Sequence, residues 1–138
     1  MSVDIKVRGY HLDIYNHVNN GRYLEFLEEG RWDYFDRHQF VQMFEAQSLA
    51  FVIANININY CRPAYAGETI RVITRMDRVG TKSAVMKQQV HLLVDGEVRD
   101  LVVDADITFC LMDHRSQKAI VLEGEARQVI ERMIEEGL

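Results

Sequence analysis

Proline and cysteine are scarce in this chain of 138 residues, which contains one proline, eight glycines and two cysteines. So little proline and glycine excludes a proline-rich linker or a collagen-like repeat. Two cysteines, Cys61 and Cys110, cannot build the disulfide framework of a small secreted domain, and no CxxC pair or Cys/His cluster predicts a zinc site. We therefore expect two free thiols in a reducing, cytoplasmic compartment.

Long hydrophobic runs and an excess of positive charge are also lacking. No segment approaches the roughly 20 apolar residues of a membrane span, and the first residues, Met1–Lys6, contain no apolar signal-peptide core. A net charge of −5 repels nucleic acid and anionic membranes. We expect no nucleic-acid partner and no stable membrane insertion. The length and the 48% hydrophobic content are typical of a single domain over residues 1–138.

Two periodicities divide the chain into expected strands and helices. Alternation of apolar and polar residues indicates strands, whereas apolar residues three and four apart indicate helices. The dipeptide Asp95-Gly96 is typical of a two-residue hairpin turn. The order predicts an α+β fold with one long helix packed on a curled antiparallel sheet. The expected strands lie near 3–7, 54–60, 70–76, 84–94, 103–111 and, more briefly, 119–121, and the expected helices near 20–36, 39–47 and 123–136.

Polar groups that can carry chemistry gather in the loop Gly9–Asn20, directly before the first long helix. The N-terminus of a helix has free N–H groups and a partial positive charge, which stabilise a developing oxyanion. Asp13 is the only carboxylate of the loop, so it is the candidate base or nucleophile for a carbonyl held there. The alternative is structural, because Asp13, Asn19 and Asn20 belong to residue types that cap turns and helices.

Two blocks of residues have a recognisable spacing. The first block is Asp13, His17-Val18-Asn19-Asn20, Tyr23-Leu24 and Glu28, and the second is Tyr60, Pro63-Ala64, Gly67-Glu68, Ile70 and Val72. The second block contains the single proline of the chain. The spacing of these residues is similar to the signature of hotdog-fold thioesterases of the 4-hydroxybenzoyl-CoA thioesterase-like family, and the wider run from Lys6 to Tyr60 is similar to bacterial long-chain acyl-CoA thioesterases.

The resemblance implies a hotdog fold, in which a long central helix is wrapped by a curled antiparallel sheet. It implies hydrolysis of medium- to long-chain fatty acyl-CoA to the free fatty acid and CoA. Asp13 would be the acidic residue, as base or nucleophile, and a backbone N–H near Asn20 would contact the oxyanion. The resemblance further implies no metal and no organic cofactor, with coenzyme A as part of the substrate, and a homodimer or homotetramer that places sites at the subunit boundary.

The remaining site residues are expectations of two kinds. His17 and Asn20 are predicted catalytic residues beside Asp13, although a histidine at a helix start is often only a structural hydrogen-bonding group. Glu28 is a rival acid, because some hotdog thioesterases use a carboxylate of the central helix, although helix charges usually face solvent. The CoA phosphates require cations or free N–H groups. The predicted substrate-binding residues are Asn19, Tyr23, Glu28, Arg62, Arg78, Lys82 and Ser83.

Three other functions remain open at this stage. A hotdog thioesterase acting on aromatic or short-chain acyl-CoA would have the same signature. A hotdog dehydratase acting on acyl carrier protein needs a catalytic His–acid pair, for which His17 and Glu28 are a poor match. A non-catalytic acyl-CoA or acyl-carrier binding protein would bind the ligand tightly without turnover, and Asp13 would not matter for it.

Overall fold

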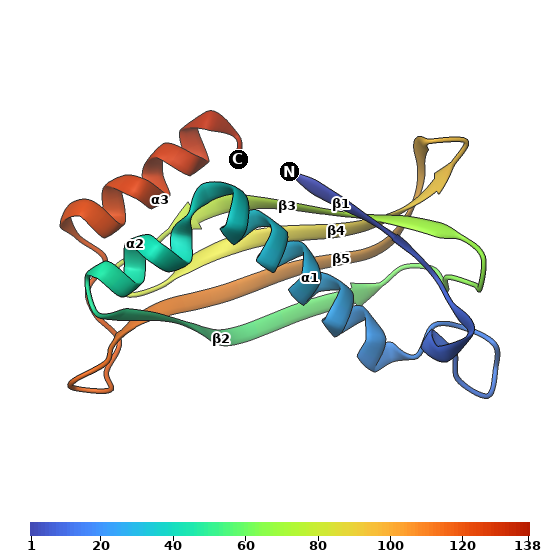
Figure 1. Ribbon diagram of the computed structural model, residues 1–138, viewed down its shortest axis with the longest axis horizontal. Helices are drawn as coiled ribbons and strands as arrows, with labels where there is room; N and C mark the ends of the chain where they lie inside the picture. Colours follow the sequence, from blue (N-terminus) through green and yellow to red (C-terminus); the bar gives the residue numbers. More distant parts are fainter. The chain divides into compact units, whose positions relative to one another are not determined.

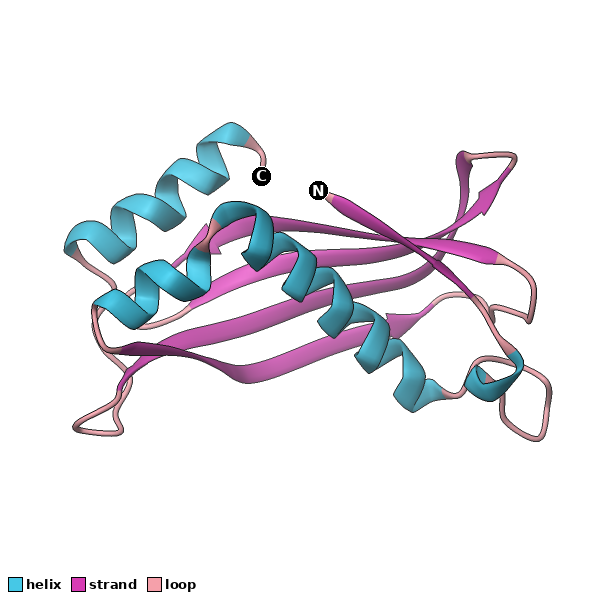
Figure 2. Cartoon of the chain, in the orientation of Figure 1, coloured by secondary structure: helices cyan, strands magenta, loops and turns pink.

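The computed structural model describes residues 1–138 and contains one five-stranded sheet and three α-helices (Figures 1 and 2). The sheet has the order β1-β3-β4-β5-β2, so β1 and β2 are its two edge strands. Strand β1 pairs antiparallel with β3, and Ile5 lies opposite Ile70. The elements are β1 Ser2–Lys6, the 3-10 turn η1 Gly9–His11, α1 Asn20–His38, α2 Phe40–Ala46, β2 Leu49–Tyr60, β3 Thr69–Val79, β4 Ala84–Val94, β5 Glu97–Asp113 and α3 Gly124–Glu136.

The α+β class predicted from the sequence is confirmed, as are the long helix beginning at Asn20 and the five main strands. The short strand expected near residues 119–121 is wrong. Only an isolated bridge forms there, between Met112 and Ala119, because the segment returns through a tight turn in which Gln117 has a positive φ of 58°. This single bridged pair of residues is not continued on either side, so the segment forms no strand.

The contacts of the chain cluster in two compact units. The first unit comprises 1–34, 58–74 and 88–105, and the second comprises 35–57, 75–87 and 106–138. Helix α1 and strands β2 to β5 each contribute residues to both units. The expectation of a single domain over residues 1–138 stays a prediction.

In the first unit, α1 approaches the sheet closely at Gly30. A Cβ at this position would lie 2.6 Å from Val72 Cγ1, far inside normal contact, so no side chain fits between α1 and β3. Both Ile70 and Val72 are fully buried, and they alternate along β3 with Arg71, which pairs with Asp4 of β1 at 2.8 Å. This is the period-two pattern of a strand that buries one face.

A buried polar network accompanies this close approach. The Gln88 side chain of β4 is fully buried, and its Nε2 donates to the carbonyl oxygen of Leu27 and to Thr74 Oγ1, each at 2.9 Å. Its Oε1 accepts a hydrogen bond from Arg31 Nη1 at 3.0 Å. Buried polar groups require such partners, because an unmade bond costs the desolvation of the group. The network therefore joins α1 to β3 and β4 at one defined position.

The second unit has an aromatic core. Phe35 packs edge-on against Phe40 and Phe51, and Phe51 stacks on Phe109 with ring centroids 4.5 Å apart. Phe44 of α2 stacks on Phe40, so the short helix buries two aromatic rings in this unit. Aromatic side chains bury large areas and account for much of the energy of such a core.

Helix α3 is held at both of its ends. The backbone N–H of Met76 donates to the carbonyl oxygen of Leu138 at 2.7 Å, just beyond the C-terminal end of the helix. Near the other end, Arg127 donates to the carbonyl oxygens of Gly80 and Leu122. None of the α-helices combines the length and the apolar composition that crossing a membrane requires.

Candidate active site

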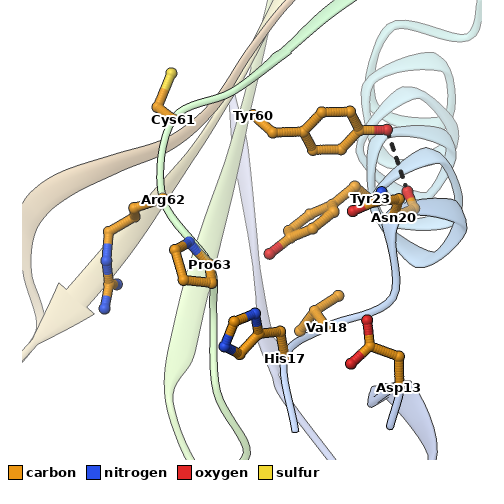
Figure 3. Close-up of a pocket in the computed structure, with 9 residues that line it drawn as sticks. All are labelled: Asp13, His17, Val18, Asn20, Tyr23, Tyr60, Cys61, Arg62 and Pro63. Atoms are coloured by element: carbon orange, nitrogen blue, oxygen red, sulfur yellow. Dashed lines mark hydrogen bonds between the residues drawn. The ribbon is translucent and has the colours of Figure 1, made fainter. Parts of the chain in front are cut away.

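A cavity of about 300 Å³ lies in the first unit, between the loop that precedes α1, the first turn of α1 and the segment that follows β2 (Figure 3). Its walls combine a carboxylate, an imidazole, a guanidinium, a thiol and two phenols with apolar surface. Such a mixture of apolar walls and a few polar groups is typical of small-molecule sites. The lining residues are Asp13, His17, Val18, Asn20, Tyr23, Tyr60, Cys61, Arg62 and Pro63.

The loop that carries Asp13 is closed by its own hydrogen bonds. The Asp13 N–H donates to the carbonyl oxygen of His17 at 2.9 Å, and the Asn16 N–H donates to the carbonyl oxygen of Asp13 at 3.1 Å. Oδ1 of the Asp13 carboxylate accepts the Tyr15 N–H at 2.8 Å, and Asn16 adopts a left-handed conformation with a φ of 63°. One oxygen of the Asp13 carboxylate, Oδ1, therefore caps the turn, as the structural alternative predicts. Its Oδ2 makes no hydrogen bond within the chain, and the half-buried carboxylate faces the cavity.

Helix α1 begins at this loop. The Asn19 side chain is its N-cap, because Asn19 Oδ1 accepts the Gly21 N–H at 2.9 Å, and the Asn19 N–H donates to the carbonyl oxygen of His11. Asn20 is the first residue of the helix and lines the cavity. Its backbone N–H is one of the amides that an α-helix leaves without an intrahelical partner. A free amide donor and a carboxylate thus line the same cavity.

The opposite wall begins at the last residue of β2. The Tyr60 hydroxyl donates to the carbonyl oxygen of Asn20 at 3.3 Å, and the Cys61 N–H donates to the carbonyl oxygen of Val102 in β5 at 2.8 Å. Arg62 Nη2 lies 3.6 Å from Glu68 Oε2. These contacts attach the start of the wall segment both to α1 and to β5 of the sheet.

Tyr65 connects two lining residues. The Arg62 guanidinium carbon lies 5.9 Å from the centre of the Tyr65 ring, and the His17 ring meets Tyr65 edge-on at 5.3 Å. The His17 side chain makes no hydrogen bond within the chain, so the structure does not pair it with Asp13. The predicted role of His17 in catalysis stays a prediction.

Tyr23 is the most deeply buried polar residue of the lining, with 3% of its surface exposed. Its hydroxyl oxygen accepts the Ala64 N–H at 3.1 Å, and Ala64 in turn accepts the Val18 N–H at 3.0 Å. The loop before α1, the helix and the segment after β2 are therefore joined around the cavity. Burial raises the pKa of the Tyr23 hydroxyl above its usual value.

The structure brings five of the predicted site residues together and leaves five outside the lining. Asn19 acts through its cap, and Glu28 is exposed on α1. The basic residues and serine of the 78–83 segment belong to the second unit, where Arg78 donates to Asp77 Oδ2 and the Ser83 carbonyl oxygen accepts the Gly80 N–H. The residues that line the cavity are Asp13, His17, Asn20, Tyr23 and Arg62, and those that do not are Asn19, Glu28, Arg78, Lys82 and Ser83.

Four lining residues were missed as site residues: Val18, Tyr60, Cys61 and Pro63. Three of the four belong to the two family blocks, which was a usable signal, whereas Cys61 carried none beyond its place between Tyr60 and Pro63. His11 was also missed. It is buried, packs edge-on against Phe26, and accepts the Arg8 N–H at Nδ1, so it supports the loop rather than the cavity.

No group of three or more His, Cys, Asp or Glu side chains is arranged to hold a metal ion. The cavity nevertheless contains what acyl transfer requires from a protein, namely a carboxylate with one free oxygen and an amide donor at a helix N-terminus.

Comparison with known proteins identifies the class. The Thioesterase-like superfamily matches residues 7–130. Over 134 residues, the chain is 47% identical to the long-chain acyl-CoA thioesterase FadM of Escherichia coli strain K12, which covers 97% of this chain and 99% of that protein. The chain belongs to the Thioesterase-like superfamily, and the family predicted from the two sequence blocks is confirmed.

Solved structures agree with this assignment. The crystal structure of YbaW, a probable thioesterase from Escherichia coli, matches with a TM-score of 0.88 at 46% identity, covering 97% of this chain and 98% of that one. A 1,4-dihydroxy-2-naphthoyl-CoA thioesterase from Synechocystis matches with a TM-score of 0.77 at 12% identity, covering 98% of this chain and 95% of that one. At this low identity the match shows a similarity of fold alone. The predicted hotdog fold is confirmed.

Proposed function

We propose that the chain is an acyl-CoA thioesterase that hydrolyses medium- to long-chain fatty acyl-CoA to the free fatty acid and CoA. The observation that supports this most directly is the shared cavity of Asp13 and the first turn of α1, in a chain 47% identical to a protein named for long-chain acyl-CoA hydrolysis. The name of FadM supports a preference for long acyl chains. The shared cavity of Asp13 and Asn20 supports hydrolysis of the thioester.

In the proposed reaction, the thioester carbonyl oxygen accepts the backbone N–H of Asn20, and the negative charge that develops there is stabilised by the N-terminus of α1. Asp13 Oδ2 acts in one of two ways. As a general base it takes a proton from water while the water oxygen bonds to the acyl carbon. As a nucleophile it forms an anhydride that water then hydrolyses. In both cases the carbon–sulfur bond breaks and the CoA thiolate takes up a proton.

The other predicted residues have supporting roles in this proposal. Arg62 binds the CoA part of the substrate, because it lines the cavity and its Nη1 has no partner in the chain. Arg78, Lys82 and Ser83 remain proposed contacts of the CoA phosphates, on their charge and polarity alone. We propose that no metal and no organic cofactor is needed, and hydrolysis that persists after dialysis against EDTA is the expected outcome.

We further propose a homodimer or homotetramer in the cytoplasm. Strand β2 is a sheet edge of twelve residues, and a long unpaired edge is a template for pairing with another strand. Asn55, Asn57 and Asn59 lie along it and keep the exposed face polar. Sedimentation equilibrium at micromolar concentration gives the assembly mass, and a monomer would contradict this part of the proposal.

The test of the function is thiol release from acyl-CoAs of increasing chain length and from one aromatic acyl-CoA. We expect turnover that is greatest for medium to long chains, and a loss of about 100-fold or more in Asp13→Asn, because that variant retains the turn but not the charge. Glu28→Gln is the matched control and should remain active. Turnover with the aromatic substrate only would change the substrate class, and tight binding without turnover would identify a binding protein.

A further inference from the structure

The Tyr23 hydroxyl uses only half of its hydrogen-bonding capacity. A phenol can accept and donate, and the Tyr23 oxygen accepts the Ala64 N–H at 3.1 Å. No acceptor within the chain takes its hydrogen, although 97% of the residue's surface is buried, as follows from its 3% exposure. A buried tyrosine usually finds a partner for its hydroxyl. The unused donor belongs to a residue that lines the cavity.

The position of this donor is fixed from several sides. Tyr23 lies one turn after Asn20 on α1, so the two residues share a helix face. Its ring meets Phe26 edge-on at 6.0 Å and packs against Tyr60 at 5.5 Å. Figure 3 shows the hydroxyl directed away from the helix, toward the side of the cavity where Pro63 and His17 lie. The donor is preorganised and has little freedom to turn.

The group that this donor fits is a carbonyl oxygen. In a thioester the carbonyl oxygen is the strong acceptor, because a divalent sulfur accepts hydrogen bonds weakly. The acceptor becomes stronger as negative charge develops on it during attack. A phenol whose oxygen already accepts an N–H, here that of Ala64, is also a better donor, since chains of hydrogen bonds polarise one another.

We propose, on the basis of the thioesterase function above, that Tyr23 is a catalytic residue whose phenolic O–H donates to the thioester carbonyl oxygen, as a second donor beside the Asn20 N–H. The hydroxyl is protonated at neutral pH, because burial raises its pKa, with Glu68 and Tyr60 acting in the same direction and the Ala64 N–H and Arg62 opposing them. The titratable groups that line the cavity with Tyr23 or act on its pKa are Asp13, His17, Tyr60, Cys61, Arg62 and Glu68.

The first experiment is Tyr23→Phe, measured with a saturating acyl-CoA series. Loss of one preorganised donor to an oxyanion lowers kcat by about 100-fold, and the expected KM changes little. This variant alone does not separate two causes, because it also leaves the Ala64 N–H without its acceptor. A second variant must retain the acceptor and remove only the donor.

Site-specific incorporation of difluorotyrosine at position 23 retains the oxygen that accepts the Ala64 N–H and makes the loss of the O–H donor controllable by pH. Fluorination lowers the phenol pKa, and the phenolate formed at higher pH still accepts the Ala64 N–H but cannot donate. We expect kcat to fall as this phenol ionises, with a midpoint equal to the pKa measured from the ¹⁹F chemical shift. Wild type, in which the Tyr23 phenol is not fluorinated, should lack this limb. Difluorotyrosine at Tyr10, which is 71% exposed, is the matched control and should follow the wild type.

The outcomes separate the two proposals. If wild type is active and Asp13→Asn is not, but the profile with difluorotyrosine at position 23 superimposes on that of wild type across the phenol ionisation, Tyr23 is only structural and the proposal fails. If wild type releases no CoA from any substrate, the thioesterase function itself fails. A new alkaline limb confined to position 23 supports the donor role.

Discussion

The Tyr60 hydroxyl and the carbonyl oxygen of Asn20, 3.3 Å apart, join the last residue of β2 to the first residue of α1. These two residues are 40 positions apart in the chain, and both line the cavity. The hydrogen bond therefore ties the helix start, where the proposed oxyanion donor lies, to the opposite wall.

Removing the hydrogen bond between Tyr60 and Asn20 should lower the activity more than the stability. Tyr60→Phe removes the hydroxyl that donates to the Asn20 carbonyl oxygen. Because Tyr60 is 47% exposed, water can hydrogen-bond to that oxygen instead, and the free energy of unfolding should fall by less than about 1 kcal/mol. We expect a several-fold lower kcat with the same KM, because the first turn of α1 is less well fixed. Steady-state kinetics and urea unfolding measure the two effects, and an unchanged kcat would contradict the prediction.

Gly30→Ala should destabilise the protein, although glycine to alanine normally favours a helix by about 1 kcal/mol. The added Cβ would lie 2.6 Å from Val72 Cγ1 and 3.1 Å from both Gln88 Nε2 and Thr74 Oγ1, so α1 must move away from the sheet. Overpacking of this kind costs about 1–3 kcal/mol. Urea unfolding measures it, with Gly9→Ala as the control because a Cβ there meets nothing within 4 Å.

Gln88→Leu should cost about 2–3 kcal/mol of unfolding free energy, because it leaves Arg31 Nη1 and the Leu27 carbonyl oxygen without this partner in a buried region. The cost should be non-additive with that of Arg31→Met, since the two residues share one hydrogen bond. A double-mutant cycle by chemical unfolding measures the coupling. Strict additivity would show that the network does not act as a unit.

His11 should make stability pH-dependent in one direction. Burial lowers the pKa of its imidazole below the ordinary value of 6.5, with Arg22 and Arg8 acting in the same direction and Glu25 opposing. The unfolded chain then binds the proton first as the pH falls below about 6.5, so the unfolding free energy declines until the folded pKa is passed. His11→Gln should flatten this part of the profile between pH 8 and 5. Parallel profiles for the two proteins would contradict the prediction.

Asn16 offers a test of the loop that orients Asp13. Asn16 has a φ of 63°, a conformation that glycine adopts readily, so Asn16→Gly should be tolerated. Asn16→Val should lower the unfolding free energy by about 1–2 kcal/mol, because a β-branched residue disfavours this conformation. If the turn orients the Asp13 carboxylate, Asn16→Val should also lower kcat at temperatures where the protein remains folded. Circular dichroism and kinetics on the same samples separate the two losses.

The sequence contained enough information for the five strands of the sheet and for the start of α1, because a half-buried strand alternates strictly and an asparagine marks a helix N-cap. It did not distinguish a strand at 119–121 from the isolated bridge that forms there. Asp13, His17 and Tyr23 were identified together because they are close in the chain. Tyr60 and Cys61 were not, since their place in the lining depends on the end of β2 lying beside the start of α1, a contact between residues 40 positions apart in the chain. Lys82 and Ser83 were selected for charge and polarity, properties that do not say which surface a turn faces.

The loop from Asp13 to His17 is maintained by backbone atoms and by one carboxylate oxygen, and the side chains at its tip contribute nothing to it. Ile14 is 88% exposed and Tyr15 72%. These two positions are therefore sites for a spectroscopic reporter. A fluorescent or fluorinated amino acid at position 14 would lie next in sequence to the proposed catalytic carboxylate without replacing any group that shapes it, and would signal substrate arrival in a single mixing experiment.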